Sequence, residues 1–243
     1  MSCNKVQVTK VCQQLEKHAS VESIPVFQLT GNRAYFFVSK LAIDVDGAPR
    51  AYHPKDRRPP DNNTKALDWL ANINSDDLHG IQGDDAHGPK PGFFVSGTAL
   101  TNPAFPENDT RHYVDAETIP YVVLVSSFPR LSNPALNTRK ADCAMVIDLK
   151  TGARSAAIFG DVGAAVGEGS LKLALNLGLD PTKSKRPPKV TGFDRVDFLH
   201  IVFPNTLVPP PWFPDEISTK AEAAFEKWGG MEQARACFPK IPA

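Results

Sequence analysis

Two acidic residues, Asp161 and Glu168, lie in a glycine-rich stretch whose pattern could bring them to one cleft. The apolar run over residues 156–159 predicts a buried strand that ends next to Asp161. Glu168 follows seven positions later, in the first turn of a predicted helix that closes at Gly178. Ser170 or the glycine before it is the expected helix cap. Glycines between the two acids allow the tight fold that this placement needs.

The two carboxyl groups are expected to hold their protons differently. A carboxyl group at the end of a strand, beside Phe159 and Val162, is desolvated, and its pKa rises. The N-terminus of a helix favours the ionised form of Glu168. Such a pair supplies the acid and the base of a hydrolysis, with Asp161 as acid and Glu168 as base. The structural alternative is that Asp161 only caps a turn and Glu168 only complements the helix dipole.

This stretch resembles a known family of enzymes. Gly160-Asp161, followed by residues 166–171 (VGEGSL) and a helix rich in alanine and leucine, is similar to the GD...GEAS segment of the family 75 glycoside hydrolases, the fungal and bacterial endo-chitosanases. The Asp and the Glu of that segment are the family's catalytic pair, so the resemblance implies these roles for Asp161 and Glu168. Two features depart from the family. The loop between the two acids is shorter than in the fungal enzymes, and Gly169 replaces the usual alanine.

Further ordered segments extend the resemblance over about residues 34 to 204. Residues 41–47 (LAIDVDG) are similar to the family's D-x-D-G segment, and residues 51–54 (AYHP) follow them as in bacterial members. Residues 119–124 match its central strand, which a similar Y-V-D-A segment precedes. The resemblance implies an inverting, endo-acting hydrolase of chitosan or a related amino-sugar polymer. It also implies secretion, although the N-terminus shows no charged segment followed by an apolar core.

Five more residues are candidates for binding the sugar. Asp44 and Asp46 alternate with apolar residues, so a strand would present both carboxylates on one face, where they would attract a cationic sugar. An exposed Tyr52 could stack on a sugar ring and His53 could hydrogen-bond a hydroxyl group. Asp115 is a further cleft candidate. For the three aspartates the structural alternative is an Asx turn, and for His53 it is an ordinary surface residue.

The pattern of elements predicts an α+β, mainly β fold: a closed or nearly closed β-barrel of seven or eight strands with three or four peripheral helices. The 243 residues fit a single catalytic-type domain over 31–243, with a C-terminal amphipathic helix at 217–228. Residues 1–30 are expected to form an N-terminal arm, because the apolar spacing over 6–19 is helical.

The composition limits the classes of partner and cofactor that are expected for this protein. Basic and acidic residues number 27 each, so bulk charge indicates neither nucleic acid nor an anionic membrane as a partner, and no apolar run reaches transmembrane length. A hydrolysis driven by proton transfer requires no cofactor. No metal site is expected, because the D-x-D-G segment lacks the rest of a calcium loop and the cysteines show no zinc-ligand spacing.

The four cysteines are expected to be free thiols. A bond between Cys3 and Cys12, or between the N-terminal arm and Cys237, is the alternative. Two further alternatives concern function: a hydrolase of peptidoglycan or another amino-sugar polymer on the same scaffold, and a carbohydrate-binding or interaction protein without turnover.

Overall fold

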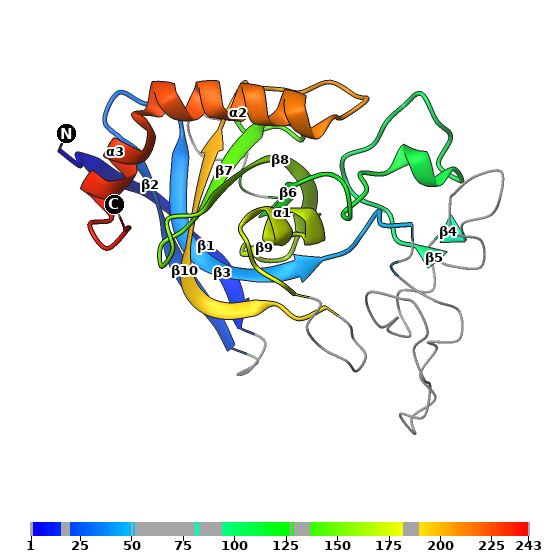
Figure 1. Cartoon of the computed structure of the whole chain (residues 1–243), viewed down its shortest axis with the longest axis horizontal. Coiled ribbons are helices and arrows are strands. Elements are labelled where there is room, and N and C mark those ends of the chain that lie inside the picture. Colours follow the sequence, from blue (N-terminus) through cyan, green and yellow to red (C-terminus); the bar gives the residue numbers. More distant parts are fainter. Residues whose placement is uncertain are drawn as a thin grey trace.

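A closed six-stranded β-barrel forms the centre of the protein in the computed structural model (Figure 1). The structure describes residues 2–15, 20–49, 51, 81–82, 94–126, 128, 137–181 and 190–242. Around the barrel the strands are β3 (Tyr35–Asp44), β10 (Phe193–Phe203), β7 (Cys143–Asp148), β8 (Arg154–Gly163), β6 (Tyr121–Val125) and β9 (Glu168–Ser170). The short β9 pairs with β6 on one side and with β3 on the other, which closes the ring. The predicted fold, mainly β with a closed barrel and peripheral helices, is confirmed.

The strands of the barrel are only partly joined as hairpins. β7 and β8 form an antiparallel hairpin around the turn at residues 150–152, with Gly152 in the left-handed region that the turn requires. β6 and β8 are parallel, however, and so are β3 and β9. These parallel pairings bring the ends of β3 and β8 and the start of β9 into one neighbourhood.

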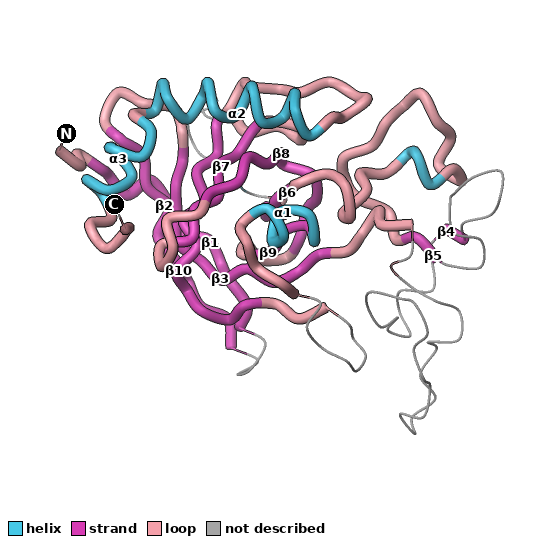
Figure 2. Tube along the Cα trace, viewed as in Figure 1, coloured by secondary structure: helices cyan, strands magenta, loops and turns pink. Residues whose placement is uncertain are grey.

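Two outer strands replace the helix predicted over residues 6–19. β1 (Lys5–Leu15) and β2 (Ser20–Leu29) are antiparallel, and β2 pairs in turn with β3 (Figure 2). The prediction of an N-terminal helical arm is therefore wrong, because the described residues within 1–30 include two strands of the barrel's own sheet. The apolar spacing suits either element, and the β-branched residues Val6, Val8, Thr9 and Val11 decide for the strand. A bulge between Gln7 and Thr9 shifts the alternation and imitates a helical period.

Three helices lie outside or against the barrel. α2 (Pro214–Trp228) is the predicted terminal helix, and it lies along β7 and β8 with Ile217, Ala221, Phe225 and Trp228 buried. It ends at Gly229, in the left-handed conformation, and α3 (Gly230–Cys237) follows. α1 (Leu171–Asn176) contacts β3, β6, β8 and β9. No helix in the described part of the chain is long and apolar enough to cross a bilayer.

A disulfide joins the two ends of the chain, which lie side by side in Figure 1. Cys3, just before β1, is bonded to Cys237, the last residue of α3. The expectation of four free thiols is thus wrong for this pair, and the alternative bond to Cys237 is present. Cys12, which is exposed, and the buried Cys143 are free. Sequence alone could not choose among the pairings, because the choice depends on where the fold brings the termini.

Short elements precede the site in the chain. β5 (Phe94–Val95) is two residues long and pairs with β4 (Ile81–Gln82). After β5 the chain runs as an irregular segment to Leu100, and a 3-10 turn, η2 (Thr110–His112), precedes β6. Because its backbone groups are not used in a sheet, the segment over residues 96–100 can bond to the strand ends beneath it.

Candidate active site

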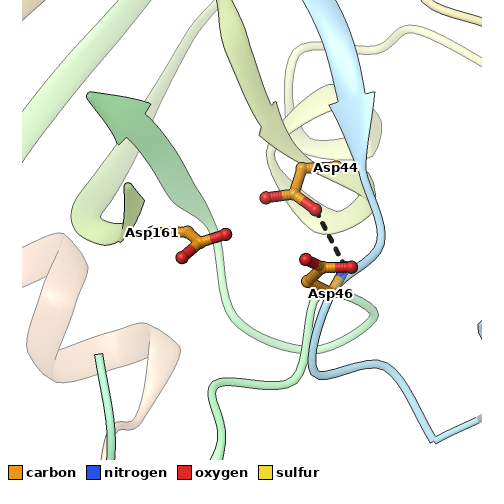
Figure 3. A group of neighbouring side chains, drawn as sticks. All are labelled: Asp44, Asp46 and Asp161. Carbon is orange, nitrogen blue, oxygen red and sulfur yellow. Dashed lines mark hydrogen bonds between the residues drawn. The ribbon is translucent and has the colours of Figure 1, made fainter. Parts of the chain in front are cut away.

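Three carboxyl groups meet where β3 and β8 approach one another (Figure 3). Asp44, Asp46 and Asp161 each contribute an oxygen atom, and these oxygens lie within 4.8 Å of one another. All three residues are half-buried. We refer to Asp44, Asp46 and Asp161 as the acidic cluster. Two of its members were predicted as sugar-binding residues and the third as a catalytic acid, and the fold brings them together.

An Asx turn, and not strand alternation, joins the first two members. Asp44 is the last residue of β3, and its Oδ1 accepts a hydrogen bond of 2.9 Å from the backbone N–H of Asp46. Gly47 then turns the chain with a φ of 76°. A Cβ atom at Gly47 would lie 1.9 Å from the carbonyl oxygen of Val114, so the turn also needs glycine for space. The structural role considered for Asp44 is therefore real, and it orients Asp46 into the cluster.

A bulge places the third member. β8 does not end at Asp161 as expected but continues to Gly163, and its pairing with β6 shifts so that Asp161 lies opposite Val123. Gly160 permits the close approach, because a Cβ atom there would lie 2.6 Å from the Cβ of Tyr121. Asp161 Oδ1 then accepts a hydrogen bond of 2.6 Å from the backbone N–H of Ala99.

The segment over residues 96–100 holds that N–H group in position. Leu100 N–H donates to the carbonyl of Gly160 over 3.0 Å, and the carbonyl of Ser96 accepts from Gly47 N–H over 2.8 Å. The Lys140 ammonium group donates to the Ala99 carbonyl. The segment therefore ties the turn after β3 to the bulge in β8, which fixes the members of the acidic cluster relative to one another.

Glu168 lies in β9, so its predicted place in the first turn of a helix is wrong. The helix begins at Leu171, and Ser170 is its cap, accepting from Leu173 N–H over 3.1 Å. That cap was predicted correctly. The N–H of Tyr121 also donates to Ser170 Oγ, over 3.0 Å, and this keeps residues 168–170 extended beside β6. The helix dipole therefore does not favour the ionised form of Glu168 as predicted, because α1 has only six residues and Glu168 lies two positions before the helix cap.

The register nevertheless puts Asp161 and Glu168 on one face of the barrel. Val123 of β6 lies opposite Asp161 on one side and opposite Glu168 on the other. Residues directly opposite each other in neighbouring strands point to the same face. Two strand spacings separate the two backbones by about 10 Å.

Two members of the acidic cluster, Asp44 and Asp161, hold their protons more tightly than isolated carboxyl groups do. Burial raises the pKa of Asp44 well above its usual value, and the charges of Asp46 and Asp161 add to the effect. Burial also raises the pKa of Asp161, against the opposing hydrogen bonds from Ala99 and Val162 and from the Asp44 side chain. The rise expected for Asp161 is present. The rise at Asp44 was not foreseen, because it depends on how the fold buries this residue and brings other carboxyl groups near it.

Tyr121 is a functional candidate that the sequence did not reveal. Its side chain is fully buried, and its hydroxyl group donates to the carbonyl of Asp46 over 3.0 Å. Its ring lies against Gly160, the residue before Asp161. Burial raises the pKa of Tyr121 well above its usual value, and the nearby carboxylates raise it further, so the hydroxyl group remains a donor. From the sequence alone Tyr121 is predicted to be an ordinary core residue. Only the register of β6 against β8 shows that it lies near Asp161.

Of the other predicted binding residues, Asp115 is among those that the structure describes. Asp115 forms the alternative Asx turn: its Oδ1 accepts from Glu117 N–H over 2.8 Å and its Oδ2 from the Thr118 hydroxyl over 2.9 Å. It is not among the three residues of the acidic cluster. Tyr52 and His53 lie outside the described residues.

Carboxylate oxygens are also the ligands that Mg²⁺ and Ca²⁺ prefer, and the acidic cluster is the one group of at least three potential metal-binding side chains in the described part of the chain. A cation would have to displace the proton that the cluster retains, so any such binding would weaken at low pH.

Comparison with known proteins finds no family model that matches the chain, and no curated protein matches its sequence.

Proposed function

We propose that the protein is a glycoside hydrolase that cleaves β-1,4 linkages within chitosan or a related amino-sugar polysaccharide and inverts the anomeric centre. The observation that carries the proposal is the shared face of Asp161 and Glu168, two strands apart, with a raised pKa at Asp161. An inverting glycosidase needs a protonated carboxyl group and a second, ionised one at about this separation. The similarity of these segments to the family 75 chitosanases supports the same pair.

In the proposed reaction Asp161 donates its proton to the glycosidic oxygen as the bond from C1 to that oxygen breaks. Glu168 accepts a proton from a water molecule on the opposite side of the ring, and the oxygen of that water forms the new bond to C1. Product release then lets Glu168 lose its proton to solvent and Asp161 regain one. The chain's own carboxyl groups thus balance the two proton transfers of each turnover.

The acidic cluster supports an amino sugar as the substrate. Asp46, whose charge adds to the raised pKa of Asp44, brings negative charge next to Asp161, and a protonated glucosamine unit would bind there more favourably than a neutral sugar. Asp44 has a different role in this proposal. Burial raises its pKa well above the usual value, so it keeps a proton, and its hydrogen bond to Asp161 opposes the rise in the pKa of Asp161 and limits how tightly that acid holds its proton.

The test is a reducing-end assay on chitosans of several degrees of acetylation, together with purified peptidoglycan. Asp161→Asn and Glu168→Gln should each lower kcat on chitosan by at least about a hundredfold, because each removes one proton transfer. Asp215→Asn, which changes an exposed acid at the start of α2, is the matched control and should keep the parent rate.

Each other outcome rejects part of the proposal. Normal cleavage by both amide variants would remove the two residues from catalysis. Release of product from peptidoglycan but not from chitosan would replace the substrate. Binding of glucosamine oligomers without new reducing ends would indicate a carbohydrate-binding protein.

A further inference from the structure

The outer strand β1 reaches the link between Asp161 and Glu168. Beyond its pairing with β2, Gln13 of β1 forms a parallel bridge with Val166. The N–H of Val166 donates to the carbonyl of Cys12 over 2.8 Å. The Val166 side chain is fully buried in the same apolar cluster as Val11. The chain two residues before Glu168 is therefore held by the N-terminal strand.

The side chain of Gln13 ties three strands together at this point. It is fully buried, with 0% of its surface exposed. Its Oε1 accepts from the backbone N–H of Lys40 in β3 over 3.2 Å, and its Nε2 donates to Glu22 Oε2 in β2 over 2.9 Å. A buried amide is stable only when such bonds are formed, so the two bonds fix β1 against β2 and β3.

Gly167 connects Glu168 to the part of β1 and β3 that Gln13 holds in place. It has a φ of 95° and lies against Lys40, because a Cβ atom there would be 3.1 Å from Lys40 Cγ and 3.2 Å from the Lys40 carbonyl oxygen. Its carbonyl accepts from Ala42 N–H over 2.7 Å. Gln13 therefore acts on both sides of Gly167, through Lys40 on one side and through its strand neighbour Cys12 and Val166 on the other.

We propose that Gln13 is a positioning residue for Glu168, and that β1 is part of the active-site architecture. The inference rests on the proposed function, in which Glu168 is the base. β9 has only three residues, and Glu168 is the first of them, so its backbone is fixed on the N-terminal side by what holds residues 166 and 167. A misplacement of about 1 Å at a catalytic group lowers turnover by as much as a hundredfold.

The test compares two buried glutamines of the outer strands. Gln13→Met keeps the side-chain length and removes both hydrogen bonds. Gln28→Met is the matched control, because Gln28 is buried in β2 and its Nε2 donates to the Arg33 carbonyl over 3.1 Å, within the turn that leads to β3. We expect Gln13→Met to lower kcat on chitosan about tenfold or more with KM changed less than about twofold, and Gln28→Met to keep both values.

Hydrogen exchange of the Val166 and Ala42 amides gives a second readout that does not depend on activity. Both amides should exchange faster in Gln13→Met than in Gln28→Met when the two variants are compared under conditions of equal global stability. Faster exchange together with the selective loss of kcat supports the proposal. Equal exchange in the two variants, or an equal loss of kcat, overturns it.

The failure of the proposed function has a different signature. If the parent protein cleaves no polysaccharide in the panel, the glycosidase proposal fails and kcat is not measured. The exchange comparison then decides the positioning of residues 166–168 alone: faster exchange in Gln13→Met supports it, and equal exchange overturns it.

Discussion

His200 should make the stability of the barrel depend on pH. The residue lies in β10 with 1% of its surface exposed, and its ring stacks on Phe37 with centroids 5.0 Å apart. Its Nε2 has no hydrogen-bond partner among the described residues. Burial lowers the pKa of His200 to about 4, and a hydrogen bond to the Lys40 backbone opposes this only in part.

The sign and size of the effect follow from the two protonation equilibria. The unfolded chain binds the His200 proton near pH 6.5, and the folded chain binds it only near pH 4. Between these values the unfolded state carries more protons, so the free energy of unfolding falls as the pH falls. A pKa difference of about 2.5 units corresponds to about 3 kcal/mol in full, of which about 2 kcal/mol is lost between pH 7 and pH 5.

The measurement compares urea unfolding of the parent and of His200→Phe at pH 7 and pH 5. The comparison is needed because the raised pKa values of Asp44, Asp161 and Asp142 contribute with the opposite sign, stabilising the fold as the pH falls. Subtracting the two proteins removes these common contributions. We expect the variant to gain about 2 kcal/mol relative to the parent on going from pH 7 to pH 5.

A core variant without a titratable group serves as the control. Val202→Ala removes buried methyl groups from the apolar cluster that contains Phe37, and it should lower stability by a similar amount at both pH values. The reasoning is refuted if the difference between the parent and His200→Phe changes by less than about 0.5 kcal/mol over this range, since one pKa unit alone is worth about 1.4 kcal/mol.

Three further perturbations test other parts of the structure. Tyr121→Phe removes the donor to the Asp46 carbonyl, so we expect a loss of about 1–2 kcal/mol in urea unfolding and a roughly tenfold lower reducing-end rate; parent values for both would exclude a positioning role. The double variant Cys3→Ser, Cys237→Ser opens a link between residues 234 positions apart, and the loop-entropy model predicts a loss of up to about 5 kcal/mol; an unchanged Tm would show that the termini remain docked without it. Gly169→Ala, which installs the residue usual in the chitosanases, places a Cβ 2.9 Å from the Tyr121 carbonyl oxygen and should cost about 1–3 kcal/mol in urea unfolding; parent stability would mean that β9 shifts readily.

The elements with strong local signals could be predicted from the sequence. The turn at residues 150–152, the Ser170 cap and the terminal helix each depend on neighbouring residues, and all three are present. The proximity of Asp44 and Asp46 could be predicted for the same reason. The closed barrel followed from the number and spacing of the strands.

What sequence reasoning missed depends on contacts between distant segments. Glu168 was assigned to the first turn of a helix because a leucine- and alanine-rich helical pattern follows it at residues 171–177, but pairing with both β3 and β6 keeps residues 168–170 extended. β1 was predicted as a helix for a similar reason, and a partner strand overrides the apolar spacing. The meeting of Asp161 with Asp44, the contact of Tyr121 with Asp46 and the bond between Cys3 and Cys237 all join residues more than 70 positions apart. No local pattern encodes such distances.

The way in which β9 closes the barrel has a consequence for how this protein can vary. Its three residues are the seam of the ring, and the first of them is Glu168. The pairing of these three residues therefore both closes the barrel and places Glu168, the proposed base. A chain that failed to close would expose the free edges of β3 and β6 and would lose the base at the same time, so defects in this seam should appear together as inactivity and aggregation.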